Sequence, residues 1–298
     1  MSQIITNIND LDFKPNTLPA MPVPCQVLLV APTHFDVEYV INPHMKDQVG
    51  AVDKMQAQNE WEHLRNFYDE LGLQVHVLNG HDGLPDMVFC ANQSLPDIDE
   101  NGACRVVMSN MHAGQRKPEV APVEAFYREQ GYEVLHLNSD DELSFEGMGD
   151  AIWHFKRRLL WGGYGFRTSK EVYRQISDLL DVPIILLELV DDRYYHLDTC
   201  FCMLNEHSVL IYPDAFTKEG RELIYAMFDT VIEATSYEAE KLFAVNAVCP
   251  DGKNVMIQQG CTDVNQKLHD AGFSVHEFST FEFIKSGGSV FCMKMLFW

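Results

Sequence analysis

Three short stretches of the chain contain residue types that carry out proton transfer and nucleophilic attack. The first is residues 194–202, Tyr-Tyr-His-Leu-Asp-Thr-Cys-Phe-Cys, in which His196 stands two positions before Asp198 in a run rich in strand-forming residues. Residues i and i+2 of an extended strand project from one face. The spacing therefore predicts an imidazole and a carboxylate in one pocket. A histidine that is only hydrogen-bonded on a half-buried strand is the alternative.

The two other stretches favour the functional interpretation. Residues 145–150, Phe-Glu-Gly-Met-Gly-Asp, place Glu146 and Asp150 in a glycine-punctuated turn. Residues 286–292, Ser-Gly-Gly-Ser-Val-Phe-Cys, end at Cys292, and the two glycines allow a tight turn that delivers a sulfur to a pocket wall. A lone cysteine near a terminus is more often a small buried hydrophobe, so the case for Cys292 depends on the other two stretches.

Composition limits the class of protein and its partners. The chain has 298 residues, 46% of them hydrophobic, and no Pro/Gly/Ser linker divides it. We expect one catalytic domain over residues 1–298, with residues 1–22 as an irregular N-terminal arm. The formal charge of -22 argues against a nucleic acid or an anionic membrane as partner, since phosphate contacts need clustered Lys and Arg. A small cationic substrate fits better.

Cysteine usage and the N-terminus indicate an intracellular protein. The sequence shows neither a signal peptide nor an apolar run of membrane-spanning length, so we expect a soluble, cytoplasmic protein with reduced thiols at its eight cysteines. The Cys200-x-Cys202 spacing is not that of a zinc site, and no second cluster accompanies it. We expect no metal and no cofactor.

A helix followed by a turn residue and a strand recurs along the chain, usually with another strand run before the helix. Five such β-α-β modules are expected, and an open doubly wound sheet or a closed ring with an axial pocket is compatible with them. The chain has no Gly-x-Gly-x-x-Gly or Walker sequence at a first turn, so a nucleotide-binding fold loses its main support. The expected helix and strand pairs are 51–71 with 74–78, 123–130 with 132–135, 170–180 with 183–186, 218–228 with 230–232, and 264–271 with 273–275.

Five motifs, in this order, resemble those of the guanidine-group-modifying superfamily. They are 85–92 (Pro-Asp-Met-Val-Phe-Cys-Ala-Asn), 145–151 (Phe-Glu-Gly-Met-Gly-Asp-Ala), 163–167 (Gly-Tyr-Gly-Phe-Arg), 195–202 and 287–292. Arginine dihydrolases and dimethylarginine dimethylaminohydrolase-like proteins look nearest. The resemblance runs from about residue 27 to residue 292. It implies a five-bladed α/β propeller, the pentein fold, with a central active site.

The resemblance also implies roles for individual residues. Cys292 would attack the central carbon of a guanidinium and form an S-alkylthiouronium intermediate, while His196 would protonate the leaving amine and then activate water. Glu146 would support the histidine and the substrate, and Asp198 would bind guanidinium nitrogens. The remaining predicted substrate-binding residues are Asn92, Asp150, Arg167, Asn42, Asp86 and Asn110.

The resemblance also bears on the choice of substrate. Deiminases of the superfamily have an aspartate where this chain has Asn92, whereas arginine dihydrolases have asparagine, and Asn42 also looks like a substrate-binding residue of those enzymes. One carboxylate fewer makes a neutral ureido group easier to accept, which predicts hydrolysis of arginine to ornithine, ammonia and carbon dioxide. Asn110 departs from the family, which often has a carboxylate-binding arginine there. Arg167 matches the other such arginine, and Arg116 is a candidate substitute.

Other functions are compatible with the same residues. A dimethylarginine dimethylaminohydrolase or an arginine deiminase would release citrulline, and an amidinotransferase would pass the amidino group to an acceptor amine. A non-catalytic binding protein of the same fold is a further alternative. The presence of the whole set of Cys292, His196 and Glu146 argues against it. The sequence leaves a homo-oligomer open.

Overall fold

The strands of the computed structural model, which describes residues 3–138 and 143–298, form five small sheets over those residues. In order of pairing, the sheets are β1 (Gln3–Ile5), β9 (Pro183–Glu188), β8 (Leu160–Tyr164) and β7 (Ala151–Trp153); β10 (Phe201–Asn205), β11 (Ser208–Ile211) and β12 (Thr230–Glu233); β13 (Asn254–Gln258) and β14 (Ser274–Phe278); β15 (Met295–Phe297), β2 (Gln26–Val30) and β3 (Gln74–Leu78); and β4 (Ser94–Ile98), β5 (Cys104–Met108) and β6 (Glu133–Leu135).

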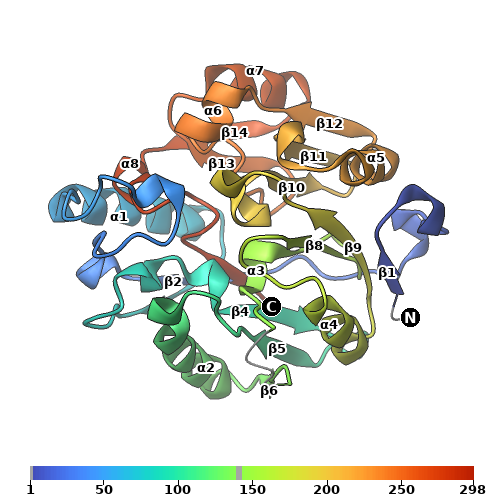
Figure 1. The fold of residues 1–298 in the computed structure, drawn as a ribbon, viewed down its shortest axis with the longest axis horizontal. Coiled ribbons are helices and arrows are strands. Elements are labelled where there is room, and N and C mark those ends of the chain that lie inside the picture. The colour runs from blue at the N-terminus through green and yellow to red at the C-terminus, as the bar shows by residue number, and fades with distance from the viewer. Residues whose placement is uncertain (1–2, 139–142) are drawn as a thin grey trace.

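One helix connects two parallel strands within each sheet. The five connections are α1 (Lys54–Glu70), α2 (Val120–Glu129), α4 (Val172–Leu180), α5 (Lys218–Met227) and α7 (Thr262–Asp270). They join β2 to β3, β5 to β6, β8 to β9, β11 to β12 and β13 to β14, all parallel pairs. The five predicted β-α-β modules are confirmed. Figure 1 shows these helices at the periphery and the short helix α3 (Gly147–Asp150) near the centre.

The helix ends follow the turn chemistry that the sequence predicted. Gly72, Gly131 and Gly272 have positive φ values of 80°, 80° and 90° and follow α1, α2 and α7 after one intervening residue. Asp181, directly after α4, takes the same left-handed conformation. Each turn sends the chain back into a strand beside the one that preceded the helix. Two short helices, α6 (Ser236–Lys241) and α8 (Phe281–Ile284), complete the described helices.

Two sequence predictions are corrected by the structure. The N-terminal arm is not wholly irregular, because β1 pairs in parallel with β9, a long-range contact that the local sequence does not reveal. Residues 194–202 are not one strand: Leu197–Thr199 form a 3-10 turn, and β10 begins only at Phe201. The backbone N–H of Leu197 donates to Asp150 Oδ1 at 2.9 Å, so it is unavailable for a strand ladder. His196 and Asp198 therefore do not share the face of one strand, and that prediction is wrong.

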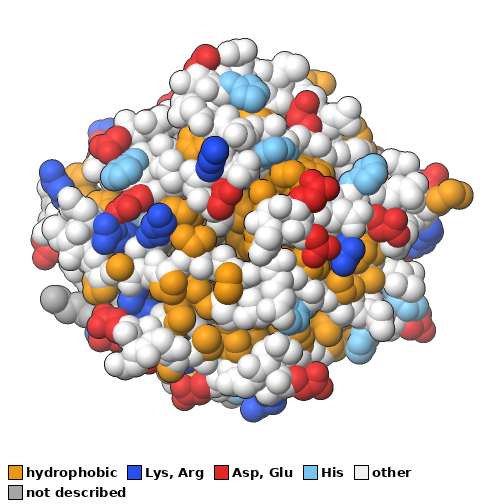
Figure 2. Space-filling view, turned by 180° about the vertical axis from the view of Figure 1, so that it is seen from behind, with side chains coloured by type: hydrophobic (Ala, Val, Ile, Leu, Met, Phe, Trp, Pro, Cys, Tyr) orange, Lys and Arg blue, Asp and Glu red, His pale blue; other side chains and the backbone are white. Residues whose placement is uncertain are grey.

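Apolar and charged side chains are unevenly distributed on the surface. Figure 2 shows hydrophobic side chains gathered across the middle of one face, with acidic and basic side chains mostly around them. In the described part of the chain, no helix combines the length and the apolar character needed to cross a membrane. All eight cysteines are free thiols.

Candidate active site

A small cavity lies beside Cys292, which is buried. Of the predicted site residues, Asn42, Asp86, Asn92, Arg167 and Cys292 line it, whereas Asn110, Glu146, Asp150, His196 and Asp198 do not. Its volume of about 10 Å³ holds about one water molecule. In the wall of this cavity, the side-chain amide of Asn42 donates to the carbonyl of Ser286 at 2.9 Å. A cavity of this size is too small for arginine, so binding requires the site to open.

Glu146 is the centre of a buried network on one side of the site. Its Oε2 accepts from His196 Nε2 at 2.6 Å and from Arg167 at 3.0 Å, while Oε1 accepts from the backbone N–H of His112 at 3.0 Å. Burial alone would raise the pKa of Glu146, but the Arg167 charge and the His196 hydrogen bond hold it well below its usual value. Glu146 is thus a fixed anion that orients the imidazole.

Asp150 positions the chain that carries His196. Its Oδ1 accepts from the Leu197 N–H, and its Oδ2 accepts from the Thr168 hydroxyl at 2.7 Å. Burial raises the pKa of Asp150 to about 6. Asp150 does not line the cavity, and its two oxygens are occupied by protein donors. The geometry gives this predicted substrate ligand a supporting position instead.

Cys292 and Asp198 face each other on the other side of the site. The Cys292 thiol donates to Asp198 Oδ2 at 3.3 Å, and the side-chain amide of Asn246 donates to the sulfur at 3.2 Å. Burial, followed by the Asp198 charge, raises the pKa of Cys292 well above its ordinary value. Burial also raises the pKa of Asp198 to about 7. The ligand-free site thus favours a protonated thiol.

The two glycines before Cys292 are required by close packing. Gly287 has φ +88°, and a Cβ there would lie 2.8 Å from Asn42 Oδ1. A Cβ on Gly288 would lie 2.4 Å from the ring of Phe89. The tight turn predicted from these residues is present, and it brings Cys292 to the cavity.

Unpartnered polar atoms surround the nucleophile. Among the described residues, Asp86 Oδ2, Asp198 Oδ1 and Asn92 Nδ2 are buried and have no hydrogen-bond partner. Leaving such atoms unpaired costs roughly 1–3 kcal/mol each, and more for a charged group. Asp198 Oδ1 and Asn92 Nδ2 are therefore free for a ligand, whereas Asp86 has the hydroxyl of Tyr39 beside it.

Arg116 fixes the orientation of the Asn92 amide. Its Nη1 donates to Asn92 Oδ1 at 2.8 Å, and because a guanidinium has only donors, the amide oxygen must face it. The other Arg116 donors bond Glu119 and the carbonyls of Asp86 and Phe89. Arg116 is therefore occupied, and the suggestion that it grips a substrate carboxylate loses support.

Gly149 lies close to both the Asn92 amide and the His196 ring. A Cβ on Gly149 would lie 2.2 Å from Asn92 Nδ2 and 3.4 Å from His196 Nδ1, so the amide and the imidazole both border this glycine. A side chain on the second glycine of the motif at 145–150 would therefore collide with the Asn92 amide.

Arg167 and Asn110 differ in their relation to the cavity. Arg167 lines it, stacks on the ring of Tyr195 at 4.8 Å and also donates to the carbonyl of Ile41. Asn110 does not line the cavity, and its amide donates to the carbonyl of Leu143 at 2.7 Å. Its predicted contact with substrate is not supported by this geometry.

Sequence reasoning missed two buried residues beside the nucleophile. Asn246 bonds the backbone N–H groups of Ser289 and Cys292 as well as the sulfur, from 46 positions away in the chain. Lys294 is fully buried two residues after Cys292. No motif marks Asn246. Lys294 stood out only as a charged residue in an apolar C-terminal run. Within residues 3–138 and 143–298, no group of three or more His, Cys, Asp or Glu side chains is arranged to hold a metal ion.

Comparison with known proteins defines the family. A family model described as N,N dimethylarginine dimethylhydrolase, eukaryotic, matches residues 32–297. The chain belongs to this family, which confirms the predicted membership of the guanidine-group-modifying superfamily.

Two curated relatives are similar over most of this chain. It is 35% identical over 271 residues to the bifunctional arginine dihydrolase/ornithine cyclodeaminase ArgZ of Synechocystis sp., covering 91% of this chain but 37% of that protein. It is also 35% identical over 267 residues to the N(G),N(G)-dimethylarginine dimethylaminohydrolase of Mycobacterium tuberculosis, covering 89% of this chain and 83% of that protein. The chain thus spans little more than a third of the bifunctional relative.

Solved structures show the same α/β fold. The substrate-bound N-terminal domain of ArgZ superimposes with a TM-score of 0.85 at 33% identity, covering 91% of this chain and 97% of that domain. A dimethylarginine dimethylaminohydrolase adduct with S-methyl-L-thiocitrulline superimposes with a TM-score of 0.77 at 19% identity, a likeness of fold alone.

Proposed function

We propose that the protein is a cysteine-dependent hydrolase of guanidino compounds that converts L-arginine to ornithine, ammonia and carbon dioxide. The observation that carries this proposal is the set of unpartnered atoms around Cys292. Asp198 Oδ1 is a buried acceptor in need of an N–H donor, which a planar guanidinium supplies, and Asp86 adds a second carboxylate at the cavity.

The first half of the reaction uses both sides of the site. The Cys292 sulfur, as thiolate, attacks the guanidinium carbon, and His196 gives a proton to the nitrogen that leaves as ammonia. Water then attacks the thiouronium carbon while His196 takes its proton, and the C–S bond breaks to release a ureido product. Glu146, bonded to His196 at 2.6 Å, stabilises the protonated imidazole that each step requires.

The second half depends on Asn92. Since Arg116 holds its Oδ1, the amide presents only N–H to the site. This donor cannot bind a guanidinium, but it can bind the oxygen of a neutral ureido group. Attack by Cys292 on that group would expel a second ammonia, and hydrolysis of the resulting S-carbamoyl intermediate would give ornithine and carbon dioxide. Over both rounds, arginine and two water molecules give ornithine, two ammonia and carbon dioxide.

The relatives support the reaction class and offer a second candidate. The dihydrolase relative supports the two-step reaction, whereas the family description and the mycobacterial relative favour release of methylamines from methylated arginine. As part of the proposal, the five sheets are the blades of a pentein propeller forming a single catalytic domain. The eight free thiols support a cytoplasmic location.

Product analysis tests this proposal. Purified protein is incubated separately with arginine, methylated arginines, agmatine and citrulline, and the products are resolved by mass spectrometry. The proposal predicts ornithine and two ammonia per arginine. Citrulline and methylamines from methylated arginine alone would support the second candidate, and no turnover of any compound would contradict both.

Asn92→Asp tests the role of the amide. The substitution replaces the Asn92 Nδ2 donor with a carboxylate oxygen, which accepts hydrogen bonds. We therefore expect the product to shift from ornithine toward citrulline. Asn110→Asp is the matched control, because it adds the same charge outside the cavity and should leave the product ratio unchanged. An unchanged ratio of ornithine to citrulline in Asn92→Asp would show that the Asn92 amide does not decide the product.

A further inference from the structure

Asn246 is a buried side chain to which the proposed mechanism gives no role. It lies in the loop between α6 and β13 and is 0% exposed. Its Oδ1 accepts from the backbone N–H groups of Ser289 at 3.0 Å and of Cys292 at 3.3 Å. Its Nδ2 donates to the carbonyl of Asp198 at 2.9 Å and to the Cys292 sulfur at 3.2 Å. One amide therefore joins the nucleophile, the turn before it and the loop that carries Asp198.

These contacts fix which end of the Asn246 amide faces the sulfur. Backbone N–H groups pair only with an acceptor, so the two N–H groups hold Oδ1, and Nδ2 is left to face the sulfur. The backbone carbonyl of Asn246 also accepts from the Phe291 N–H at 3.0 Å. Three N–H groups of residues 289–292 thus end on this one residue, which holds the turn that carries Cys292.

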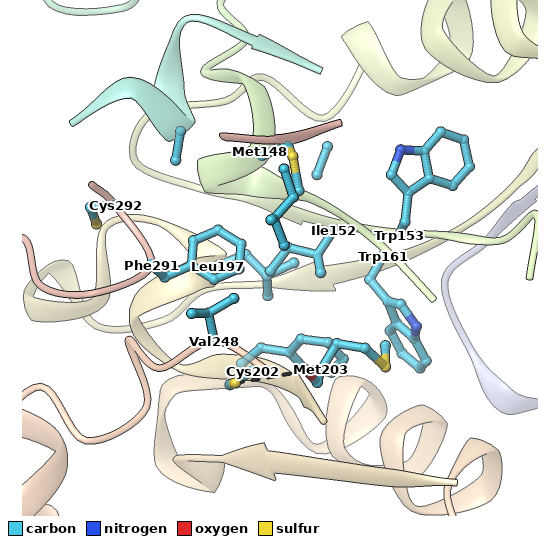
Figure 3. Close-up of a cluster of buried hydrophobic side chains, with 14 of the residues drawn as sticks. Met148, Ile152, Trp153, Trp161, Leu197, Cys202, Met203, Val248, Phe291 and Cys292 are labelled. Atoms are coloured by element: carbon cyan, nitrogen blue, oxygen red, sulfur yellow. Dashed lines mark hydrogen bonds between the residues drawn. The ribbon is translucent and has the colours of Figure 1, made fainter. Parts of the chain in front are cut away.

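Apolar packing also holds this turn. Figure 3 shows the Phe291 ring among buried apolar side chains, including Leu197 and Val248, with the Cys292 sulfur apart from that cluster. The Phe291 side chain thus belongs to the apolar interior, and the sulfur is left to the polar groups of the site. Asn246 and Asp198 are the two side chains that bond it.

The two hydrogen bonds of the sulfur respond differently when the thiol ionises. The thiol donates to Asp198 Oδ2 at 3.3 Å, so this bond is lost with the proton, and the carboxylate then faces a thiolate. The Asn246 N–H remains a donor and bonds an anion more strongly than a thiol. Burial, followed by the Asp198 charge, raises the pKa of Cys292, whereas the Ser289 N–H and the Asn246 amide act in the opposite direction.

Other charged and titratable groups surround the same sulfur. Arg116 and Arg167 line the cavity, but each is paired with a carboxylate, Glu119 at 2.8 Å and Glu146 at 3.0 Å respectively. The remaining groups are Asp86 and Tyr195, which line the cavity, and Lys294, which acts on both Asp198 and Cys292. In the described part of the chain, Asn246 is the side chain that donates a hydrogen bond to the sulfur.

We propose that Asn246 is a further catalytic residue: its amide N–H donates to the reacting sulfur of Cys292 and keeps that hydrogen bond once the sulfur is a thiolate, while its Oδ1 holds the turn at 289–292. The first contact stabilises the attacking form of the nucleophile, and the second fixes the direction of its attack. Both contacts serve attack on a guanidinium and on a ureido group, a consequence that rests on the proposed function.

Alkylation of Cys292 tests the donor without any substrate. Asn246→Asp keeps an oxygen for the two backbone N–H groups and replaces only the N–H donor. Labelling by iodoacetamide is measured by peptide mass spectrometry at pH 7, 8 and 9 in the wild type and in the variant. Loss of the donor should slow labelling of Cys292 at pH 8 at least about tenfold, the factor that corresponds to one unit of pKa. Labelling that is not slowed relative to the controls would overturn the proposal.

Two thiols in each sample separate this effect from a loosened fold. Loosening would expose the buried Cys292 and speed its labelling, which is the opposite sign. Buried Cys261 reports such loosening, and exposed Cys25 reports the reactivity of the reagent. The ratio of the Cys292 rate to the Cys261 rate is therefore compared between the wild type and the variant, and the proposal predicts that it falls.

A matched variant controls for the substitution itself. Asn205→Asp introduces the same carboxyl group at the end of β10, and its retained oxygen still accepts from the His207 N–H at 2.9 Å in the wild-type geometry. It should label like the wild type. If Asn246→Asp does not fold, Asn246→Ala, which also lacks the donor, is measured in its place with the same expected slowing.

Turnover addresses the part that rests on the proposed function. Asn246→Asp should lower kcat for arginine at least about tenfold and change KM less than about threefold, because Asn246 does not line the cavity. A normal kcat would contradict the role of Asn246 in the reaction. If the wild type hydrolyses no guanidino compound, the proposed function fails, while the labelling ratio still decides whether Asn246 stabilises the thiolate.

Discussion

The two sides of the candidate site differ in how completely their polar groups are paired. On the histidine side, both oxygens of Glu146 and both oxygens of Asp150 accept hydrogen bonds from the protein. On the cysteine side, one oxygen of Asp198 and one of Asp86 have no partner among the described residues. The first side is assembled before substrate arrives, and the second leaves its acceptors for the substrate.

The largest effect is expected at the nucleophile on the incomplete side. Cys292→Ser should keep the fold and lower turnover by at least about a thousandfold, as removal of a covalent nucleophile does. Steady-state assays of ammonia release measure this. Cys104→Ser, in the strand β5, is the matched control and should remain active. Undiminished activity of Cys292→Ser would exclude it as the nucleophile.

The contrast in pairing predicts losses of stability of different size for two isosteric substitutions. Glu146→Gln breaks a buried network that includes Arg167 and His196 and should cost about 3–5 kcal/mol of unfolding free energy. Asp198→Asn removes an incompletely paired buried charge and should cost much less. Denaturant unfolding of both variants measures these changes in unfolding free energy. Equal losses in the two variants would contradict the difference between the two sides of the site.

The pH dependence of stability sharpens the same contrast. The folded-state pKa of Asp198 is raised from 3.8 to about 7 by burial, so the carboxyl stabilises the fold below about pH 4, and this contribution is lost as pH rises through about 7. The Asp198→Asn variant has no carboxyl group at this position, so it does not lose this stability as the pH rises. Its Tm relative to the wild type should therefore increase between pH 4 and 8, and a constant difference would refute the raised pKa.

Substrate discrimination should depend on Asp198 to a smaller extent. Its unpartnered oxygen is proposed to bind guanidinium N–H groups, and a charged hydrogen bond is worth about 1.5–3 kcal/mol. Asp198→Asn should accordingly lower kcat/KM for arginine about 10- to 100-fold more than for citrulline, which carries no positive charge on its ureido group. Equal losses of kcat/KM for arginine and citrulline would show that Asp198 does not bind the guanidinium group.

The smallest effect is expected at Asn110, which lies outside the cavity and bonds the Leu143 carbonyl. Asn110→Ala should change KM for arginine less than about threefold, since it removes no contact within the site. A large rise in KM would show that Asn110 reaches the substrate once the site has opened.

Local patterns in the sequence predicted much of the fold. Apolar spacing and the residues after each helix placed α1, α2, α4, α5 and α7 correctly to within a few residues. Pairing of β1 with β9 was missed because it joins segments about 180 residues apart. The stretch around His196 was read as a strand because its residues favour strands, but Asp150 captures the Leu197 N–H and turns the chain.

The sequence motifs predicted which residues belong to the site, but not the contacts that these residues make. Cys292, Asn42, Asp86, Asn92 and Arg167 do meet at one cavity. That Arg116 orients Asn92, and that Asn246 bonds the sulfur, depends on contacts between residues 24 and 46 positions apart, for which no local pattern exists.

The central claim is that the incomplete side of the site receives the guanidino group. A crystal structure of Cys292→Ser with L-arginine tests it most directly. The account predicts guanidinium nitrogens within hydrogen-bond distance of Asp198 Oδ1, with Arg116 still bonded to Asn92 Oδ1. A guanidinium bound away from Asp198, or an Asn92 oxygen released from Arg116 to hold it, would contradict the account.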